Sequence, residues 1–256
     1  MAMEVNDIKQ GFIDSKGGEI EYFVNVYNEI LYLNEELKTT IEDAEAYRYA
    51  YDYAYKHFKK KLADEDFLMV NLALVQAYNI AKYPWRGKEA ASRVLLLAEK
   101  SKDMNDMVKS ELYIEMADFY RSVSLYAKAA ECFDVAYRKN NNPSILYDLI
   151  VCHKYANPNY VFFMSDKEIT EKCKEYAPQI FNVIDGKGYI LIDPIENSEE
   201  FQKYYDELHE LMRERVLQEG DLNLEIQSWN ILEELYLEKG ITWKSPSKMN
   251  PKVMFD

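Results

Sequence analysis

The chain has 256 residues, three widely spaced cysteines, 8 glycines and 7 prolines, a composition typical of a mostly helical protein. Its formal net charge of −14 argues against a nucleic-acid or membrane partner, since both surfaces are anionic, and favours a neutral or basic one. We recognise no signal peptide, and no apolar run approaches the roughly 18 residues of a membrane span. We therefore expect a cytoplasmic protein with reduced thiols.

The N-terminal part predicts paired helices after a flexible start at residues 1–18. The first helix is expected over 19–37, and the second begins at a Thr39 or Thr40 cap and extends to about Lys61. Alanines recur every fourth residue in the second helix, beside tyrosines at the same spacing. The alanines suit close contact between helices, whereas the tyrosines suit either the core or a binding surface.

The most regular pattern lies in the middle of the chain. One helix pair is expected over about 66–81 and 87–100, and the next over 110–143. Within the helix pair over 110–143, small and large residues recur at helical spacings: Tyr113, Met116, Ala117, Tyr120, Ala129, Phe133 and Ala136. Small residues let antiparallel helices approach closely and rings fill the space between them. We therefore predict that the three alanines, Tyr120 and Phe133 are buried.

The C-terminal part is less regular. After a helix over 144–155, an irregular insertion is expected over 157–200. This insertion would contain a helix over 166–184, in spite of Pro178, and a β-hairpin-like element near 185–195, where a turn precedes the run Tyr-Ile-Leu-Ile.

A final helix pair is expected over 201–240. Gly220 and Gly240 would close its two helices, and Asp221 would cap the second one. Residues 241–256 then form a tail, which either straps back onto the last helix or remains a free peptide.

The pattern over about 66–155, with a partial copy at 229–236, resembles the tetratricopeptide repeat superfamily, whose helix–turn–helix units have about 34 residues. The resemblance implies an all-α fold in which the helix pairs of 19–156 stack as a right-handed α-solenoid, with first helices lining a concave groove. Members bind peptides, partner domains or peptide pheromones there. Chaperone-binding members clamp a carboxylate with Lys, Asn and Arg, but the matching positions hold Ile114 and Asp118, which argues against that clamp in this repeat.

The leading interpretation is a non-catalytic binding protein that holds a peptide or protein segment in this groove. The groove candidates, chosen by repeat position, are Tyr78, Tyr113, Asp118 and Tyr147. One alternative is a peptide-responsive signalling regulator, and another is an enzyme that uses the irregular region 160–197. The incomplete last repeat also allows a homo-oligomer, since it leaves an apolar end to cover.

Residues that could carry chemistry do not form a complete set in the sequence. Asp206 and His209 share a helix face, as in half of a di-iron site, but further ligands are missing, so a solvated acidic face is the favoured interpretation. Cys152 precedes His153, yet adjacent helical residues point about 100° apart and do not form a catalytic pair. We therefore predict no catalytic residues, no metal and no cofactor.

Overall fold

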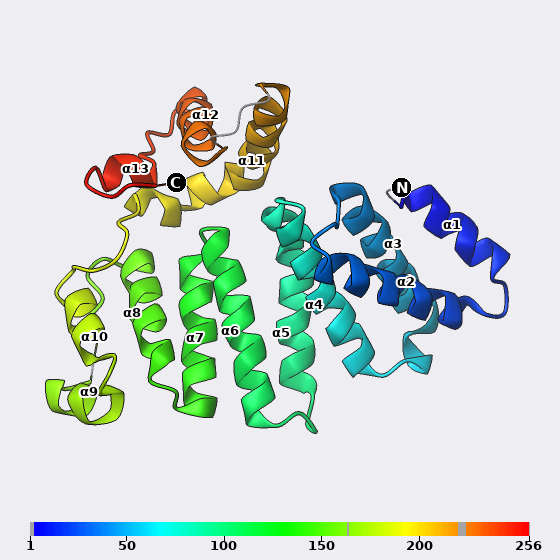
Figure 1. Ribbon diagram of the computed structural model, residues 1–256, viewed down its shortest axis with the longest axis horizontal. Helices are drawn as coiled ribbons and strands as arrows, with labels where there is room; N and C mark the ends of the chain where they lie inside the picture. The colour runs from blue at the N-terminus through cyan, green and yellow to red at the C-terminus, as the bar shows by residue number, and fades with distance from the viewer. Residues whose placement is uncertain (1–2, 163, 220–223, 256) are drawn as a thin grey trace. The chain divides into compact units, whose positions relative to one another are not determined.

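The computed structural model describes residues 3–162, 164–219 and 224–255, and all the regular elements in these ranges are helices (Figure 1). The chain divides into two compact units, Met1–Leu112 and Tyr113–Asp256. The boundary lies inside helix α6 (Asp106–Ser122), within the repeat predicted over 110–143. None of the helices among the described residues is long and apolar enough to cross a membrane.

Unit 1 consists of helices that largely match the predicted ones. They are α1 (Val5–Asp14), α2 (Glu19–Glu35), α3 (Ile41–Phe58), α4 (Asp64–Ile80) and α5 (Lys88–Lys100), with the 3-10 turns η1 (Lys59–Lys61) and η2 (Pro84–Gly87). Thr40 caps α3 as predicted: its hydroxyl accepts from the Asp43 N–H at 3.1 Å, and the Asp43 carboxylate accepts from the Thr40 N–H at 3.0 Å.

Residues 1–18, expected to be flexible, contain helix α1. Ile8 and Phe12 lie four residues apart on one face of this helix, and both are buried. The Phe12 ring stacks on that of Tyr53 in α3, with centroids 4.0 Å apart. Apolar contact with α3 therefore holds this segment in place.

The alanine and tyrosine stripes of α3 form part of the core of unit 1. Ala46, Ala50 and Ala54 are buried, and so are Tyr47 and Tyr51. The alanines allow α3 to pack closely against α1, α2 and α4. The core interpretation thus holds for two of the tyrosines on α3.

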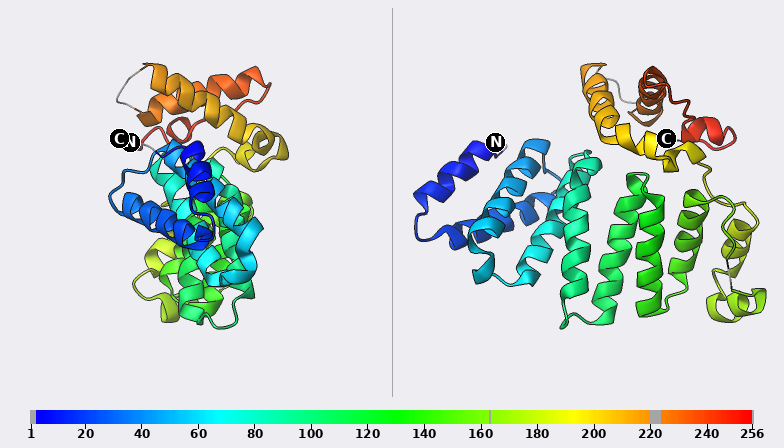
Figure 2. Two further views of the ribbon diagram at one scale, coloured as in Figure 1. Left: turned by 90° about the vertical axis from the view of Figure 1, so that its right-hand side faces the viewer. Right: turned by 180° about the vertical axis from the view of Figure 1, so that it is seen from behind.

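Unit 2 begins within α6 and continues through seven further α-helices and a 3-10 turn of the described chain. They are α7 (Tyr126–Asn140), α8 (Ser144–Ala156), α9 (Asp166–Cys173), α10 (Ala177–Ile184), η3 (Pro194–Asn197), α11 (Glu199–Glu219), α12 (Leu224–Glu238) and α13 (Pro246–Met249). Helices α7 and α8 pack side by side, and so do α11 and α12 (Figures 1 and 2).

The predicted core of the central repeat is confirmed. Ala117, Ala129 and Ala136 are completely inaccessible to solvent, and Tyr120 and Phe133 are each 2% exposed. The small side chains and the two rings are therefore in the packed interior, as their spacing indicates.

The irregular insertion differs from its prediction in two places. The helix expected over 166–184 is split into α9 and α10, because Pro178 lacks an amide N–H and is tolerated only in the first turn of a helix, where α10 places it. The β-hairpin-like element predicted near 185–195 is wrong. Aromatic and β-branched residues favour a strand only where a second strand provides a ladder, and the described residues of unit 2 form none.

The C-terminal tail packs back onto unit 2. Gly240 adopts a φ of +80° and ends α12 as predicted, whereas Gly220 and Asp221 lie outside the described residues. After Gly240, Ile241 and Trp243 are buried, and the Trp243 ring lies 5.7 Å from that of Tyr236 on α12. The tail thus takes the form of a strap.

Candidate functional site

One face of α8 binds the main chain of a distant segment. Tyr147 and Tyr155 are about two turns apart on this face. Their hydroxyls donate to the carbonyl oxygens of Gly188 at 2.9 Å and Ile190 at 2.6 Å. The accepting carbonyls belong to alternate residues of a stretch that is neither helix nor strand. We name residues 188–192 the inner segment.

The tail contributes a second set of contacts to the inner segment. The Asn250 side chain, at the end of α13, accepts from the Leu191 N–H at 2.8 Å and donates to the Leu191 carbonyl at 2.7 Å. Its amide nitrogen also donates to the Pro246 carbonyl at 2.7 Å, which orients the side chain. Main-chain groups of the inner segment that would pair in a sheet are thus satisfied by side chains.

The inner segment begins at a turn that needs glycine. Gly188 has a φ of +75°, in the left-handed region, and a Cβ at this position would lie 3.2 Å from the Cβ of Asn182. The Lys187 N–H donates to the Asn182 carbonyl at 2.7 Å and closes the turn after α10. The turn predicted from Asp185 to Gly188 is therefore present.

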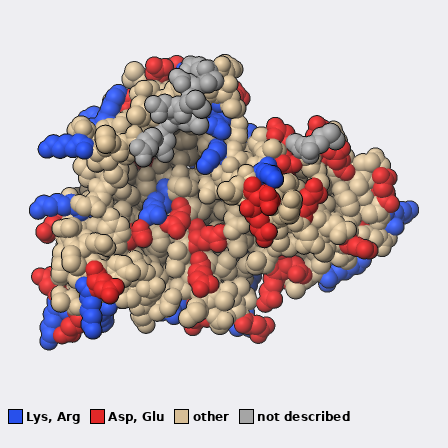
Figure 3. Space-filling model, viewed as in Figure 1, with Lys and Arg blue, Asp and Glu red and all other residues tan. Residues whose placement is uncertain are grey.

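An ionic cluster lies next to Tyr147. The Arg121 guanidinium on α6 donates to Asp148 on α8 at 2.5 Å and to Asp118 on α6 at 2.7 Å. The Asp118 side chain is half exposed; the partial desolvation that it does undergo raises its pKa, the nearby Asp148 carboxylate also raises it, and Arg121 opposes both effects. Two carboxylates share one guanidinium, so the cluster carries a net negative charge. Acidic side chains are spread over the face seen in Figure 3.

A buried carboxylate fixes the chain directly after the inner segment. Glu196 in η3 accepts from the Ser124 and Tyr126 hydroxyls, both at 2.9 Å, and from the Trp243 indole N–H at 3.0 Å. Burial raises the pKa of Glu196, and these three donors oppose the rise. Gln202 adds a bond from its side-chain amide to the Ser124 carbonyl at 3.0 Å. Glu196 therefore links the α6–α7 turn, η3 and the tail.

The four predicted groove residues have different surroundings. Tyr78 on α4 is only 1% exposed, so it fills the core of unit 1 and presents no surface to a partner, a correction to the sequence interpretation. Tyr113, Asp118 and Tyr147 all belong to unit 2. Asp118 is exposed and Tyr113 and Tyr147 are half-buried. The Arg121 bridge brings the helices of Asp118 and Tyr147 together.

Sequence reasoning missed several residues of this surface. Tyr155 lies eight positions after Tyr147 and so on the same helix face, a signal that could have identified it. Arg121 lies three residues after Asp118, a spacing that brings helical side chains together. Asn250 and Glu196 are in irregular stretches and contact residues far away in the sequence, so no local pattern marks them.

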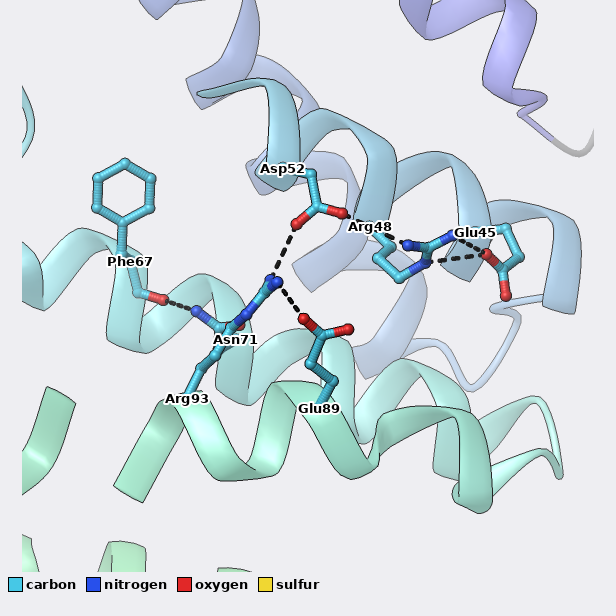
Figure 4. Close-up of polar contacts among 7 residues, drawn as sticks. All are labelled: Glu45, Arg48, Asp52, Phe67, Asn71, Glu89 and Arg93. Atoms are coloured by element: carbon cyan, nitrogen blue, oxygen red, sulfur yellow. Dashed lines mark hydrogen bonds and ion pairs between the residues drawn. The ribbon is translucent and has the colours of Figure 1, made fainter. Parts of the chain in front are cut away.

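A second polar cluster connects helices of unit 1 (Figure 4). Arg93 on α5 donates to Asp52 on α3 at 2.9 Å and also pairs with Glu89 on its own helix. Arg48 on α3 lies between Glu45, at 3.0 Å, and Asp52, at 3.4 Å. Arg86 also pairs with Glu45, at 3.2 Å, so three guanidinium groups balance three carboxylates, and the Asp52–Arg93 pair joins α3 to α5. We therefore assign it a stabilising role.

The cysteines and the histidine considered for catalysis lie in environments typical of structural residues. Cys132, Cys152 and Cys173 are free and buried, and burial raises the pKa of the Cys132 and Cys152 thiols to about 12. These two thiols are thus protonated near neutral pH and poor nucleophiles. His209 places Nδ1 2.7 Å from the Tyr205 carbonyl. The described part of the chain has no group of three or more His, Cys, Asp or Glu residues that could hold a metal.

Comparison with known proteins found no matching family model, no matching curated protein and no matching solved structure. The function is therefore inferred from the geometry of unit 2. In that unit α8 and Asn250 bind the main chain of the inner segment, and the ionic cluster includes Asp148, the residue next to Tyr147.

Proposed function

We propose that this chain is a non-catalytic binding protein that holds an extended peptide, or an extended segment of a partner protein, on the face formed by α8 and the unit 2 part of α6. The observation that carries the proposal is the pair of hydroxyl bonds from Tyr147 and Tyr155 to alternate carbonyls. Main-chain bonds of this kind provide affinity for extended peptides in general, and neighbouring side chains provide specificity.

The proposed groove is of the tetratricopeptide type, with α6 and α8 as successive first helices of a right-handed stack. The direct Arg121–Asp148 bond between α6 and α8 supports this arrangement, since it requires the two first helices to be neighbours. The buried alanines of the central repeat support it too, because they allow the close helix pairing that such a stack needs.

The chemistry of the surface favours one kind of partner. The tyrosine rings offer rigid apolar area, and their hydroxyls offer donors to main-chain carbonyls. The net negative charge of Asp118, Arg121 and Asp148 favours a Lys or Arg beside the bound segment. We therefore expect a peptide or protein with a basic residue next to an apolar extended run, met in the cytoplasm.

The test is quantitative capture from native lysate. The test variant combines Tyr113→Ala, Asp118→Ala and Tyr147→Ala, and the matched control combines Tyr32→Ala and Glu99→Ala on exposed positions of unit 1. We expect one or more partners to be captured by the wild type and the control and lost by the test variant, with equal helix content by circular dichroism. If all three proteins capture the same partners in equal amounts, the surface is wrongly assigned.

A further inference from the structure

The inner segment is attached to unit 2 by polar contacts and contributes little to its core. Gly188 and Leu191 are exposed, and the other three residues are half-buried. By contrast, Glu196, four residues further on, is 3% exposed. The polar contacts that hold the segment to α8 and α13 are bonds to its main chain, made by Tyr147, Tyr155 and Asn250, and the Tyr189 ring also lies 5.7 Å from that of Tyr155.

Such contacts are those of a bound peptide. Main-chain groups of a core segment usually pair within helices or sheets, whereas here side chains from two other elements satisfy them. The apolar side chains of Tyr189, Ile190, Leu191 and Ile192 remain partly open to solvent. A free peptide with the same main-chain shape could make the bonds to Tyr147 and Tyr155 on α8.

We propose that the inner segment is an internal ligand of the α8 face, which an apolar peptide from a partner displaces. This inference rests on the proposed function and adds the chemistry of the partner and a form of regulation. The competing peptide carries an apolar run like that of residues 189–192. Asn250 acts as the latch that keeps the internal ligand in place.

The direction of the inner segment also indicates where a basic residue of the partner lies. Tyr147 contacts Gly188 and Tyr155 contacts Ile190, so the segment runs in the same direction as α8. The preceding residue, Lys187, is therefore toward the end of α8 that carries Asp148. A partner that copies this arrangement has its Lys or Arg two positions before the apolar run, toward the negatively charged cluster.

The chain around the inner segment permits a local release. On one side, Gly186 and Gly188 have φ values of +76° and +75° and provide flexible backbone. On the other side, Glu196 is held by three donors from other parts of the unit. The segment can therefore open between a glycine-rich turn and a fixed anchor while the helices stay packed.

The experiment measures binding of a fluorescein-labelled peptide of residues 186–194 to the full chain by fluorescence anisotropy. The released variant combines Tyr189→Ser, Ile190→Ser, Leu191→Ser, Ile192→Ser and Asn250→Ala. The control combines Ile13→Ser, Leu96→Ser and Asn159→Ala, all at exposed positions. We expect the released variant to bind the peptide at least about ten-fold more tightly than the wild type or the control, because the internal ligand lowers the competent fraction.

A peptide of the same composition in scrambled order shows whether binding depends on sequence. Equal affinity of the wild type and the released variant, or no binding to either, overturns the inference. If the released variant melts at a lower temperature than the control, the single variant Asn250→Ala is used in its place. The peptide affinity of the single variant must then exceed that of the wild type. Partner capture that depends on Tyr113 and Asp118 is a separate readout. If this partner capture persists while the labelled peptide does not bind, the internal-ligand inference is wrong and the proposed function is retained.

Discussion

The side-chain amide of Asn250 pairs with both main-chain groups of Leu191, which precedes it by 59 residues. In a sheet a neighbouring strand makes these two bonds. Here one asparagine supplies the donor and the acceptor, since its amide carries both. The residues around Leu191 have strand propensity, yet they satisfy their main chain without forming a strand.

Replacing Asn250 with alanine should loosen the inner segment and leave the helices intact. We expect faster amide hydrogen exchange at Leu191 and a loss of about 1 kcal/mol in the free energy of unfolding, because two part-buried bonds disappear. Exchange measured by mass spectrometry on peptides that cover 188–192 checks this. Asn159→Ala makes the same chemical change at an exposed position and should leave the exchange unchanged. An Asn250→Ala protein with wild-type exchange at Leu191 would contradict the latch.

Glu196 gives a pH dependence with a definite sign. Its pKa is raised in the folded protein because burial disfavours the carboxylate. The native state therefore binds a proton at a higher pH than the unfolded chain does, and this uptake stabilises the native state as the pH falls from neutral toward the unfolded pKa. This stabilisation is fully present below the pKa that Glu196 has in the unfolded chain. It is lost as the pH rises through the raised pKa that Glu196 has in the folded protein.

Glu196→Gln isolates this contribution, because glutamine keeps the shape and removes the charge. The melting temperature of the wild type should rise relative to that of the variant as the pH is lowered over this range. Both proteins are melted in the same buffers, so other titrating groups cancel. A difference that stays constant with pH would show that Glu196 does not titrate as proposed.

Arg121 should matter more for stability than an arginine whose ion pair stays within one helix. Arg121→Ala leaves Asp118 and Asp148 together without their shared cation and removes a bond between α6 and α8, so we expect a loss of about 1–2 kcal/mol. Arg138 pairs with Asp134 on the same helix and is exposed, and Arg138→Ala should change stability by less than about 0.5 kcal/mol. Urea unfolding measures the free energy of unfolding of the two variants. Equal losses of this free energy would contradict the bridging role of Arg121.

The tail should contribute to the stability of unit 2 through Trp243. This ring packs near Phe201 and Tyr236, and its indole N–H donates to Glu196. Trp243→Ala should therefore cost about 3 kcal/mol, from lost packing and a lost bond to a buried carboxylate. Trp229 is half-buried beside Phe255, so Trp229→Ala should cost clearly less. A smaller effect at position 243 than at 229 in urea unfolding would contradict the strap.

Local patterns in the sequence predict the helices well. Ala129 and Ala136 are about two turns apart on α7, and Ala117 lies on α6 three residues before Tyr120; close helix pairing requires small residues at these positions, so their burial could be foreseen. Thr40 followed by Asp43 is a local capping signal that depends on residues three positions apart. Such features need only a few neighbouring residues to be recognised.

The contacts that build the candidate site depend on residues far apart in the chain. Glu196 meets Ser124 and Trp243, and Asn250 meets Leu191, all across irregular stretches without periodicity. Repeat position also fails to distinguish Tyr78 from Tyr147. Helix α4 packs against α2, α3 and α5 and buries Tyr78, whereas Tyr147 on α8 is half-buried and its hydroxyl bonds to the inner segment.

The most direct test of the account is to remove the two hydroxyls that define the α8 face. In the released variant, Tyr147→Phe and Tyr155→Phe together delete the donors to the peptide carbonyls and keep both rings. We expect the affinity for the labelled 186–194 peptide to fall about ten-fold or more, while Tyr32→Phe with Tyr176→Phe leaves it unchanged. Unchanged affinity after loss of the Tyr147 and Tyr155 hydroxyls would contradict main-chain recognition by α8.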